Sequence, residues 1–259
     1  MQALVKLWIN IAKSFLGALV FYTTIPLPSL WVLDLERIAR WAPLIGIIIG
    51  GILGLIDEGL RLIGIPKLTC SVLLVGIWVV LTGGLHLDGA IDTADGLAVP
   101  DRERRLEVMK DSVTGAFGVM AAVILLLLKT ASLSELQCDL WLALMVSAGW
   151  GRWGQVVAIA FYPYLRPTGK GAFHKNSFSF PQDILFGLVF LLSLSVLQLF
   201  LNPHKWWIAI GTVFAGCAIS TLTGFWLYLQ LGGHTGDTYG AVVEWTEALL
   251  LCLFTSLFH

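Results

Sequence analysis

Long apolar runs, separated by short polar breaks, recur along the whole 259-residue chain. A helix needs about 20 apolar residues to cross the ~30 Å hydrocarbon core of a bilayer. Runs of this kind stand near 41–64, 69–87, 113–131, 140–161, 183–201, 206–229 and 241–258. Lipid offers no hydrogen-bond partner to the backbone, so each run must be helical. The sequence predicts an all-α fold, a polytopic transmembrane helical bundle of about seven spans.

The segment before the first of these runs is also expected to be helical. Residues 3–24 carry Lys6 and Lys13 seven positions apart on one face, so this N-terminal helix is either amphipathic and interfacial or a further span. With 57% hydrophobic and 13% charged residues, the chain leaves no stretch for a soluble domain, and 1–259 is expected to be a single integral membrane domain. A net charge of -1 argues against nucleic acid as a partner.

The charges of the connections predict which side each loop faces. The connections 100–110 and 162–182 are rich in Lys and Arg, as cytoplasmic loops are. In the connection 132–139 the charged residues, Glu135 and Asp139, are both acidic. Four predicted spans separate Asp88 from Asp237, and an even number returns the chain to the same face. We therefore expect two acidic active-site segments, 83–112 and 231–247, on the cytoplasmic side.

Three aspartates, Asp88, Asp92 and Asp95, follow one another at spacings of four and three. On a helix their directions fall within about 60° of each other, and neighbours lie ~6 Å apart, where each pair repels by about 3 kcal/mol. Lys67 is the only Lys or Arg between Arg61 and Arg102. A bound divalent cation would offset this repulsion, and carboxylate oxygens are ligands that Mg²⁺ prefers. The number of metal ions and the carboxylate that acts as general base stay open. The simpler alternative is that the three aspartates cap the helix and face water.

The second acidic segment reads LGGHTGDTYGAVVEWTE. Its glycines and threonines, Gly233, Thr235 and Gly236 among them, resemble a turn that cradles phosphate at a helix N-terminus. Asp237 near the helix start is a candidate metal ligand, and Glu244 a candidate substrate contact. An ordinary interhelical loop would be the alternative if the first acidic helix lay on the other side.

Further candidates for substrate binding are scattered between the two segments. Arg152 lies inside an apolar run, where an unpaired charge is costly and so suggests function. A single histidine in an apolar run is more often structural than a ligand. His86 is still a candidate, because it lies two residues before Asp88. The remaining candidates lie in the polar connections, where a charge can equally serve topology: Arg105, Lys110, Asp111, Ser112 and Lys170.

The blocks TGGLHLDGAIDTADGL, LEVMKDSVTGAFG and LGGHTGDTYGAVVE closely resemble the bacterial cobalamin synthase family, the adenosylcobinamide-GDP ribazoletransferases. The resemblance implies that α-ribazole, or its 5′-phosphate, attacks adenosylcobinamide-GDP, so that GMP leaves and adenosylcobalamin or its 5′-phosphate forms. It implies Mg²⁺ as cofactor, with Asp88, Asp92, Asp95 and Asp237 as catalytic and metal-holding residues. Thr24 departs from the family, whose members often have arginine before the first prolines.

Two other classes of function remain as alternatives. The spaced aspartates are similar to those of CDP-alcohol phosphotransferases, but the arginine expected after the first Asp-Gly is missing. A cation or metabolite transporter would place its acids at mid-span, not at one edge. The expected location is the bacterial cytoplasmic (inner) membrane, multi-pass, with the active site facing the cytoplasm. The lipid bilayer is the expected partner besides the substrates, and assembly into a homo-oligomer is left open.

Overall fold

The computed structural model describes residues 2–28, 31, 33–111, 113–136, 139–166 and 170–257. Within these ranges every named element is a helix, which confirms the all-α fold. The elements are α1 (Gln2–Tyr22), η1 (Ile38–Trp41), α2 (Ala42–Leu62), α3 (Lys67–Leu81), α4 (Leu85–Ala98), α5 (Arg102–Val108), α6 (Ala116–Glu135), α7 (Leu140–Phe161), α8 (Lys170–Asn176), α9 (Gln182–Leu201), η2 (Pro203–Lys205), α10 (Trp206–Leu231) and α11 (Gly236–Leu257).

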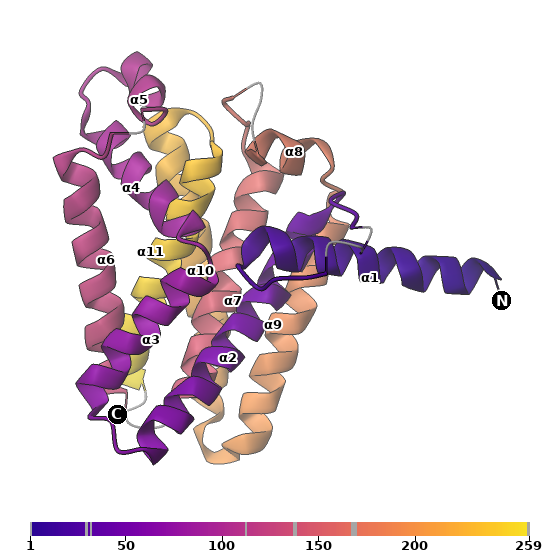
Figure 1. Ribbon diagram of the computed structural model, residues 1–259, viewed down its shortest axis with the longest axis vertical. Coiled ribbons are helices and arrows are strands. Elements are labelled where there is room, and N and C mark those ends of the chain that lie inside the picture. The colour runs from indigo at the N-terminus through magenta and orange to yellow at the C-terminus, as the bar shows by residue number, and fades with distance from the viewer. Residues whose placement is uncertain are drawn as a thin grey trace.

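The long helices run roughly along one axis and form a bundle (Figure 1). Within the described residues, five helices are long and apolar enough to cross a membrane, or six if α3 and α4 count as one bent span. The one expected span outside this count is 140–161, which forms α7. This helix is 22 residues long but carries Arg152 and Gln155. It tolerates these polar side chains because α2, α9, α10 and α11 pack around it and most of its residues are buried.

The expected span 69–87 is broken in the structure. Helix α3 ends at Leu81, and α4 starts at Leu85 in a direction that differs by 91°. Gly83 and Gly84 between them have φ values of 60° and 68°, a left-handed conformation that glycine adopts without steric cost. The three aspartates therefore lie on a separate helix, α4, at one end of the bundle.

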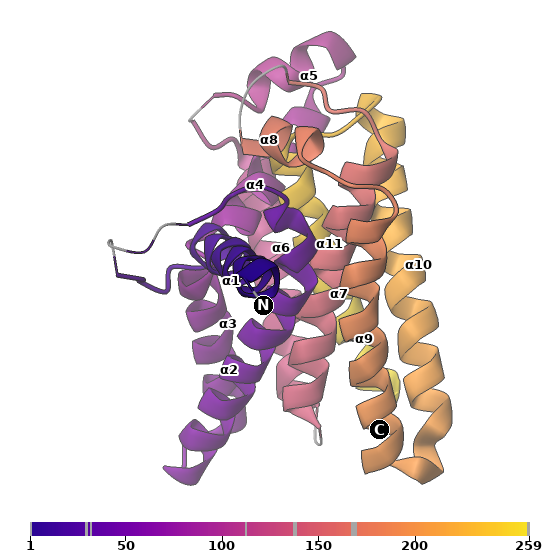
Figure 2. The same cartoon turned by 90° about the vertical axis from the view of Figure 1, so that its right-hand side faces the viewer.

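Helix α1 runs across the bundle, not along it. In Figure 1 it extends sideways from the other helices, and in Figure 2 it is seen nearly end-on. Among the described residues its part Trp8–Tyr22 is an apolar helix, shorter than the helices that qualify as spans. Since spanning helices follow the bundle axis, this orientation favours the interfacial alternative for α1.

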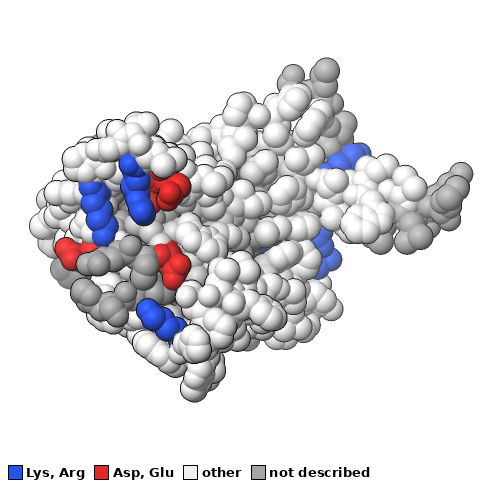
Figure 3. Space-filling model, turned by 90° about the horizontal axis from the view of Figure 1, so that it is seen from below, with Lys and Arg blue, Asp and Glu red and all other residues white. Residues whose placement is uncertain are grey.

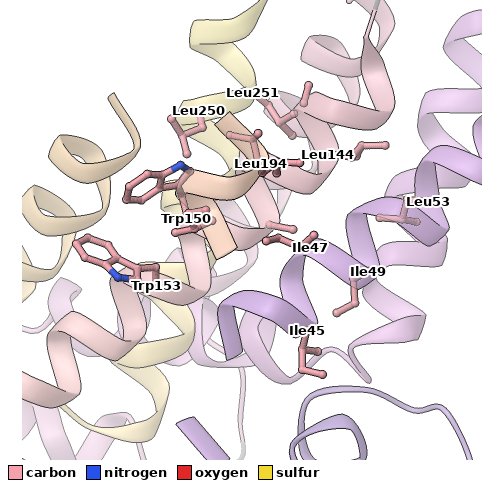
Figure 4. Packing of buried hydrophobic residues seen from close by; sticks show 14 of the residues in the cluster. Ile45, Ile47, Ile49, Leu53, Leu144, Trp150, Trp153, Leu194, Leu250 and Leu251 are labelled. Atoms are coloured by element: carbon pink, nitrogen blue, oxygen red, sulfur yellow. The ribbon is translucent and has the colours of Figure 1, made fainter. Parts of the chain in front are cut away.

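The centre of the bundle is the contact between α2 and α7. Gly46, Gly50 and Gly54 stand on one face of α2, and a Cβ atom built at Gly50 would lie 2.4 Å from the Cα atom of Met145. Small residues at spacing four let helix backbones approach closely, as is common between membrane helices. Around this contact, aliphatic and tryptophan side chains from α2, α7, α9 and α11 interdigitate (Figure 4).

The two ends of the bundle differ. The short helices α5 and α8 lie at the upper end in Figure 1, together with the start of α11. Seen from below, the opposite end is mostly uncharged, and its charged side chains are confined to a few places (Figure 3). The connection η2 between α9 and α10 belongs to this lower end.

This arrangement predicts opposite labelling of two exposed positions, Glu103 on α5 and His204 in η2. In a background without native cysteines, Cys at His204 should react with an impermeant thiol reagent added to intact cells lacking an outer-membrane barrier. Cys at Glu103 should react only after permeabilisation, because loops rich in Lys and Arg are expected on the inner side of the membrane. Labelling of both positions from the same side would contradict the topology.

Candidate active site

Helices α4 and α11 touch at backbone distance. A Cβ atom built at Gly89 would lie 2.6 Å from the carbonyl oxygen of Asp237, and one built at Gly240 would lie 2.8 Å from that of His86. A side chain at either glycine would therefore push the helices apart. This double glycine contact places Asp88 of α4 near Asp237 at the start of α11, although the two segments are far apart in the sequence.

The N-terminus of α11 is held by a pair of threonines and a histidine. The Thr235 amide donates to the Thr238 hydroxyl at 2.8 Å, and the Thr238 amide donates to the Thr235 hydroxyl at 3.3 Å. The His234 ring lies 3.0 Å from the Thr238 hydroxyl and 3.2 Å from the Gly224 carbonyl oxygen. Burial lowers the pKa of His234 to about 4, so the ring is neutral at pH 7. These contacts fix where Asp237 points.

A short parallel bridge joins this turn to the loop after α7. Tyr164 pairs with His234, the His234 amide donates to the Pro163 carbonyl at 2.9 Å, and the Leu165 amide donates to the His234 carbonyl at 2.8 Å. Gly233 allows the approach, because a Cβ atom there would lie 2.6 Å from the Pro163 carbonyl oxygen. The bridge places the next residue of the loop, Arg166, beside the acidic helices.

Arg166 forms an ion pair with Asp237, with Nη2 2.8 Å from Oδ2, and also donates to the Met109 carbonyl at 3.1 Å. From the sequence, Arg166 counted only among the basic residues of the connection 162–182, and its place at the site was missed. Its position depends on the bridge between two distant loops, which no local pattern reveals. The only available signal was a basic residue in a loop on the same side as the acids.

The acidic segments enclose a cavity of about 270 Å³. Three charged residues line it, Asp88 from α4, Asp237 from α11 and Arg166 from the loop. The other lining residues are neutral: Phe21, Leu85, His86, Gln155, Tyr164, Gly171, His174, Gly236, Tyr239 and Gly240. The cavity thus draws on α1, α4, α7, α8 and α11, and two of its three charged residues, Arg166 and Asp237, are paired with each other.

The three aspartates of α4 have different surroundings. Asp88 is exposed, and Asp92 is half-buried. Asp95 accepts hydrogen bonds from the backbone amides of Gly115 and Gly118, at 2.7 and 2.8 Å, at the start of α6. A carboxylate at a helix N-terminus stabilises that terminus, so Asp95 ties α4 to α6.

The described residues contain no group of three or more His, Cys, Asp or Glu side chains close enough to hold a metal ion by themselves. Asp88 and Asp237 nevertheless line the same cavity from two helices. Mg²⁺ commonly takes one or two carboxylates and completes its shell with water and substrate phosphates. The donor set fits an Mg²⁺ site that the substrate completes.

Arg152 and Glu244, both expected to contact substrate, belong to a buried ion-pair network. The Lys129 ammonium lies 2.7 Å from Glu244 and 2.6 Å from Glu247, and Arg152 lies 2.7 Å from the other oxygen of Glu247. Arg152 and Glu247 are fully buried. The network joins α6, α7 and α11 inside the bundle, which accounts for charges in otherwise apolar runs.

The remaining predicted residues have varied positions. Arg105 donates to the carbonyls of Val99 and Gln230, both at 2.9 Å, and so binds the ends of α4 and α10. Lys110 and Asp111 are exposed to solvent. Ser112 lies outside the described residues, as does the side chain of Lys170, although its backbone starts α8.

Comparison with known proteins gives a consistent result. The family model described as cobalamin-5-phosphate synthase matches residues 14–255. A relative from Trichormus variabilis named adenosylcobinamide-GDP ribazoletransferase is 56% identical over 94% of this chain and 97% of its own length. Relatives of the same name from Synechocystis sp. and Thermosynechococcus vestitus are 47% and 48% identical, covering 91% and 94% of this chain and 91% and 96% of their own. No solved structure matches the chain significantly.

The buried network predicts a large effect of losing its shared cation. Lys129→Met leaves Glu244 and Glu247 with one cation fewer, and removal of one partner from a buried ion pair costs about 3–5 kcal/mol. Thermal unfolding in detergent should show a clear loss of stability. The double variant Lys129→Met with Glu244→Gln should regain part of it, because one buried charge is removed. The exposed Lys205→Met is the control and should melt like the parent. Normal melting of Lys129→Met would refute the network.

Proposed function

The chain belongs to the cobalamin-5-phosphate synthase family, and on this basis we propose that it is an adenosylcobinamide-GDP ribazoletransferase. It would join α-ribazole, or its 5′-phosphate, to adenosylcobinamide-GDP and release GMP. A free ribose hydroxyl attacks the β-phosphorus, the bond from this phosphorus to the bridging oxygen breaks, and GMP leaves with that oxygen. The alternatives of a CDP-alcohol phosphotransferase and of a transporter find no support in the comparisons.

The observation that carries the proposed mechanism is the cavity with Asp88, Asp237 and Arg166 on its wall. Phosphoryl transfer depends mainly on positioning and on neutralising oxyanion charge. Arg166 offers a planar set of donors suited to phosphate oxygens. Asp88 and Asp237 would hold Mg²⁺ together with the substrate phosphates, and the charge of Asp92 beside them would strengthen its binding. When bound, the ion would neutralise the pyrophosphate. In this proposal Asp95, whose oxygens already accept two amides, acts mainly by positioning α4.

The chain has several helices able to cross a membrane, and we infer a multi-pass protein of the bacterial inner membrane. The connections near the site carry the excess of Lys and Arg, which supports a site facing the cytoplasm. The nucleotide substrate would then reach the cavity from the compartment in which nucleotides are abundant.

One assay tests the reaction. Purified protein with adenosylcobinamide-GDP, α-ribazole and Mg²⁺ should produce cobamide, followed by its spectrum, and GMP, followed by chromatography, in equal amounts. Chelation of Mg²⁺ should stop both, and restored Mg²⁺ should restart both. Release of GDP in place of GMP would show attack at a different bond and refute the proposed step.

Asp92→Asn separates a metal site from a structural cap. Asp88, Asp95 and Asp237 all repel a charge at Asp92, with Arg166 as an opposing charge. Neutralising Asp92 should therefore leave the Mg²⁺-free protein as stable as the parent or more so. Activity should fall at least about a hundredfold, and the rise in melting temperature on adding Mg²⁺ should shrink.

The matched control is Glu58→Gln, an exposed acid on α2 that lines none of the site. It should change neither turnover nor the Mg²⁺ response. If Asp92→Asn destabilises the Mg²⁺-free protein and keeps most of its turnover, Asp92 has a structural role and the metal assignment fails.

A further inference from the structure

The inner wall of the cavity is built from flat rings. His86 and His174 line the cavity, and both stack on Tyr22, which does not line it, with ring centroids 6.2 Å and 6.1 Å apart. Tyr164 and Tyr239 stack on each other at 6.0 Å on another part of the wall. Aromatic walls of this kind accept a planar ring system by offset stacking.

The same wall carries polar atoms that the described part of the chain leaves without hydrogen-bond partners. These atoms are both ring nitrogens of His86, both ring nitrogens of His174, Oε1 of Gln155 and Oη of Tyr239. The exposed fractions of His86, His174 and Gln155 are 2%, 2% and 4%. A buried polar group without a partner costs about 1–3 kcal/mol, so a concentration of them in one cavity indicates a ligand that completes the bonds.

Two kinds of residue line the cavity, and we call them its charged part and its neutral part. Asp88, Arg166 and Asp237 form the charged part. His174 belongs to the neutral part, because burial lowers the pKa of its ring to about 4. A ligand that matches both parts has phosphate at one end and a neutral, planar, hydrogen-bonding group at the other, which describes a nucleotide.

We propose that the neutral part, formed by His86, Gln155, His174 and Tyr239, binds the guanine base of the GDP moiety. This inference rests on the proposed function, which brings two bases to the site. The Oε1 atom of Gln155 accepts no hydrogen bond within the described residues, although the Tyr22 hydroxyl lies near it. Guanine offers two donors, N1–H and its exocyclic amine. The benzimidazole of α-ribazole, with one ring nitrogen bonded to ribose, offers a single acceptor and no N–H donor. The unpartnered hydrogen-bonding atoms of the cavity therefore match guanine better than benzimidazole.

The first test uses the parent protein and needs no variant. GMP, IMP, AMP and CMP are compared as ligands by calorimetry in detergent with Mg²⁺. GMP should bind most tightly, and IMP, which lacks the 2-amino group, should bind about tenfold or more weakly, because one lost hydrogen bond leaves a buried acceptor unpaired. Equal affinity for GMP and CMP would overturn the proposal.

The second test compares Gln155→Met with Gln198→Met. Gln198 on α9 is also 4% exposed with an unpartnered Oε1 among the described residues, but it does not line the cavity. Gln155→Met should raise the KM for adenosylcobinamide-GDP about tenfold or more and weaken GMP binding to match, with the KM for α-ribazole unchanged. Gln198→Met should change none of these.

The outcomes separate the two proposals. A raised KM for α-ribazole in place of adenosylcobinamide-GDP would show that the pocket takes the benzimidazole base, and would overturn this inference while leaving the reaction intact. Absence of cobamide formation by the parent protein would refute the proposed function, and the nucleotide comparison would still decide whether the pocket binds guanine. If Gln155→Met melts far below Gln198→Met, the affinities of the parent protein for GMP and IMP decide whether the pocket binds guanine.

Discussion

The site depends on one contact, the approach of α4 to α11 at backbone distance. Gly89 and Gly240 each face a carbonyl of the other helix, and neither position has room for a Cβ atom. Helices that meet through larger side chains are usually 8–10 Å apart, and at that distance Asp88 and Asp237 would line separate surfaces. The close contact makes them two walls of one cavity. Mutual repulsion of the acids opposes the contact, so the rest of the bundle must hold it.

Two features supply that support. The ion pairs of Lys129, Glu247 and Arg152 link α6, α7 and α11 in a region of low dielectric, where a lost partner cannot be replaced by water. Asp95 ties α4 to the start of α6 through two amides. Both acidic helices are thus anchored to α6, one at its end near the site and one deeper in the bundle. The buried charged side chains therefore hold the helices in place, and the charged side chains at the cavity are available to bind a ligand.

Local patterns in the sequence were sufficient for the helices, for the common face of Asp88 and Asp92, and for the family. They were insufficient wherever a residue's role depends on a distant partner. Arg166 is placed by the bridge between Tyr164 and His234. Lys129 lies in an apolar run, and its acidic partners are over a hundred positions away in the sequence. The break before α4 was missed because an apolar run and two glycines are equally compatible with a straight span. The metal and the substrate contacts stay predictions.

The size of the cavity has a consequence for selectivity. At about 270 Å³ it is smaller than most pockets that enclose a whole drug-sized ligand, which start at about 300 Å³. A corrin macrocycle must therefore remain outside it. An enzyme of this shape would recognise its donor through the fragment that it discards, and the retained parts would meet only the rim. Corrinoids with altered side chains on the macrocycle would pass through the same site, and discrimination among them would fall to whichever enzyme attaches the GDP moiety.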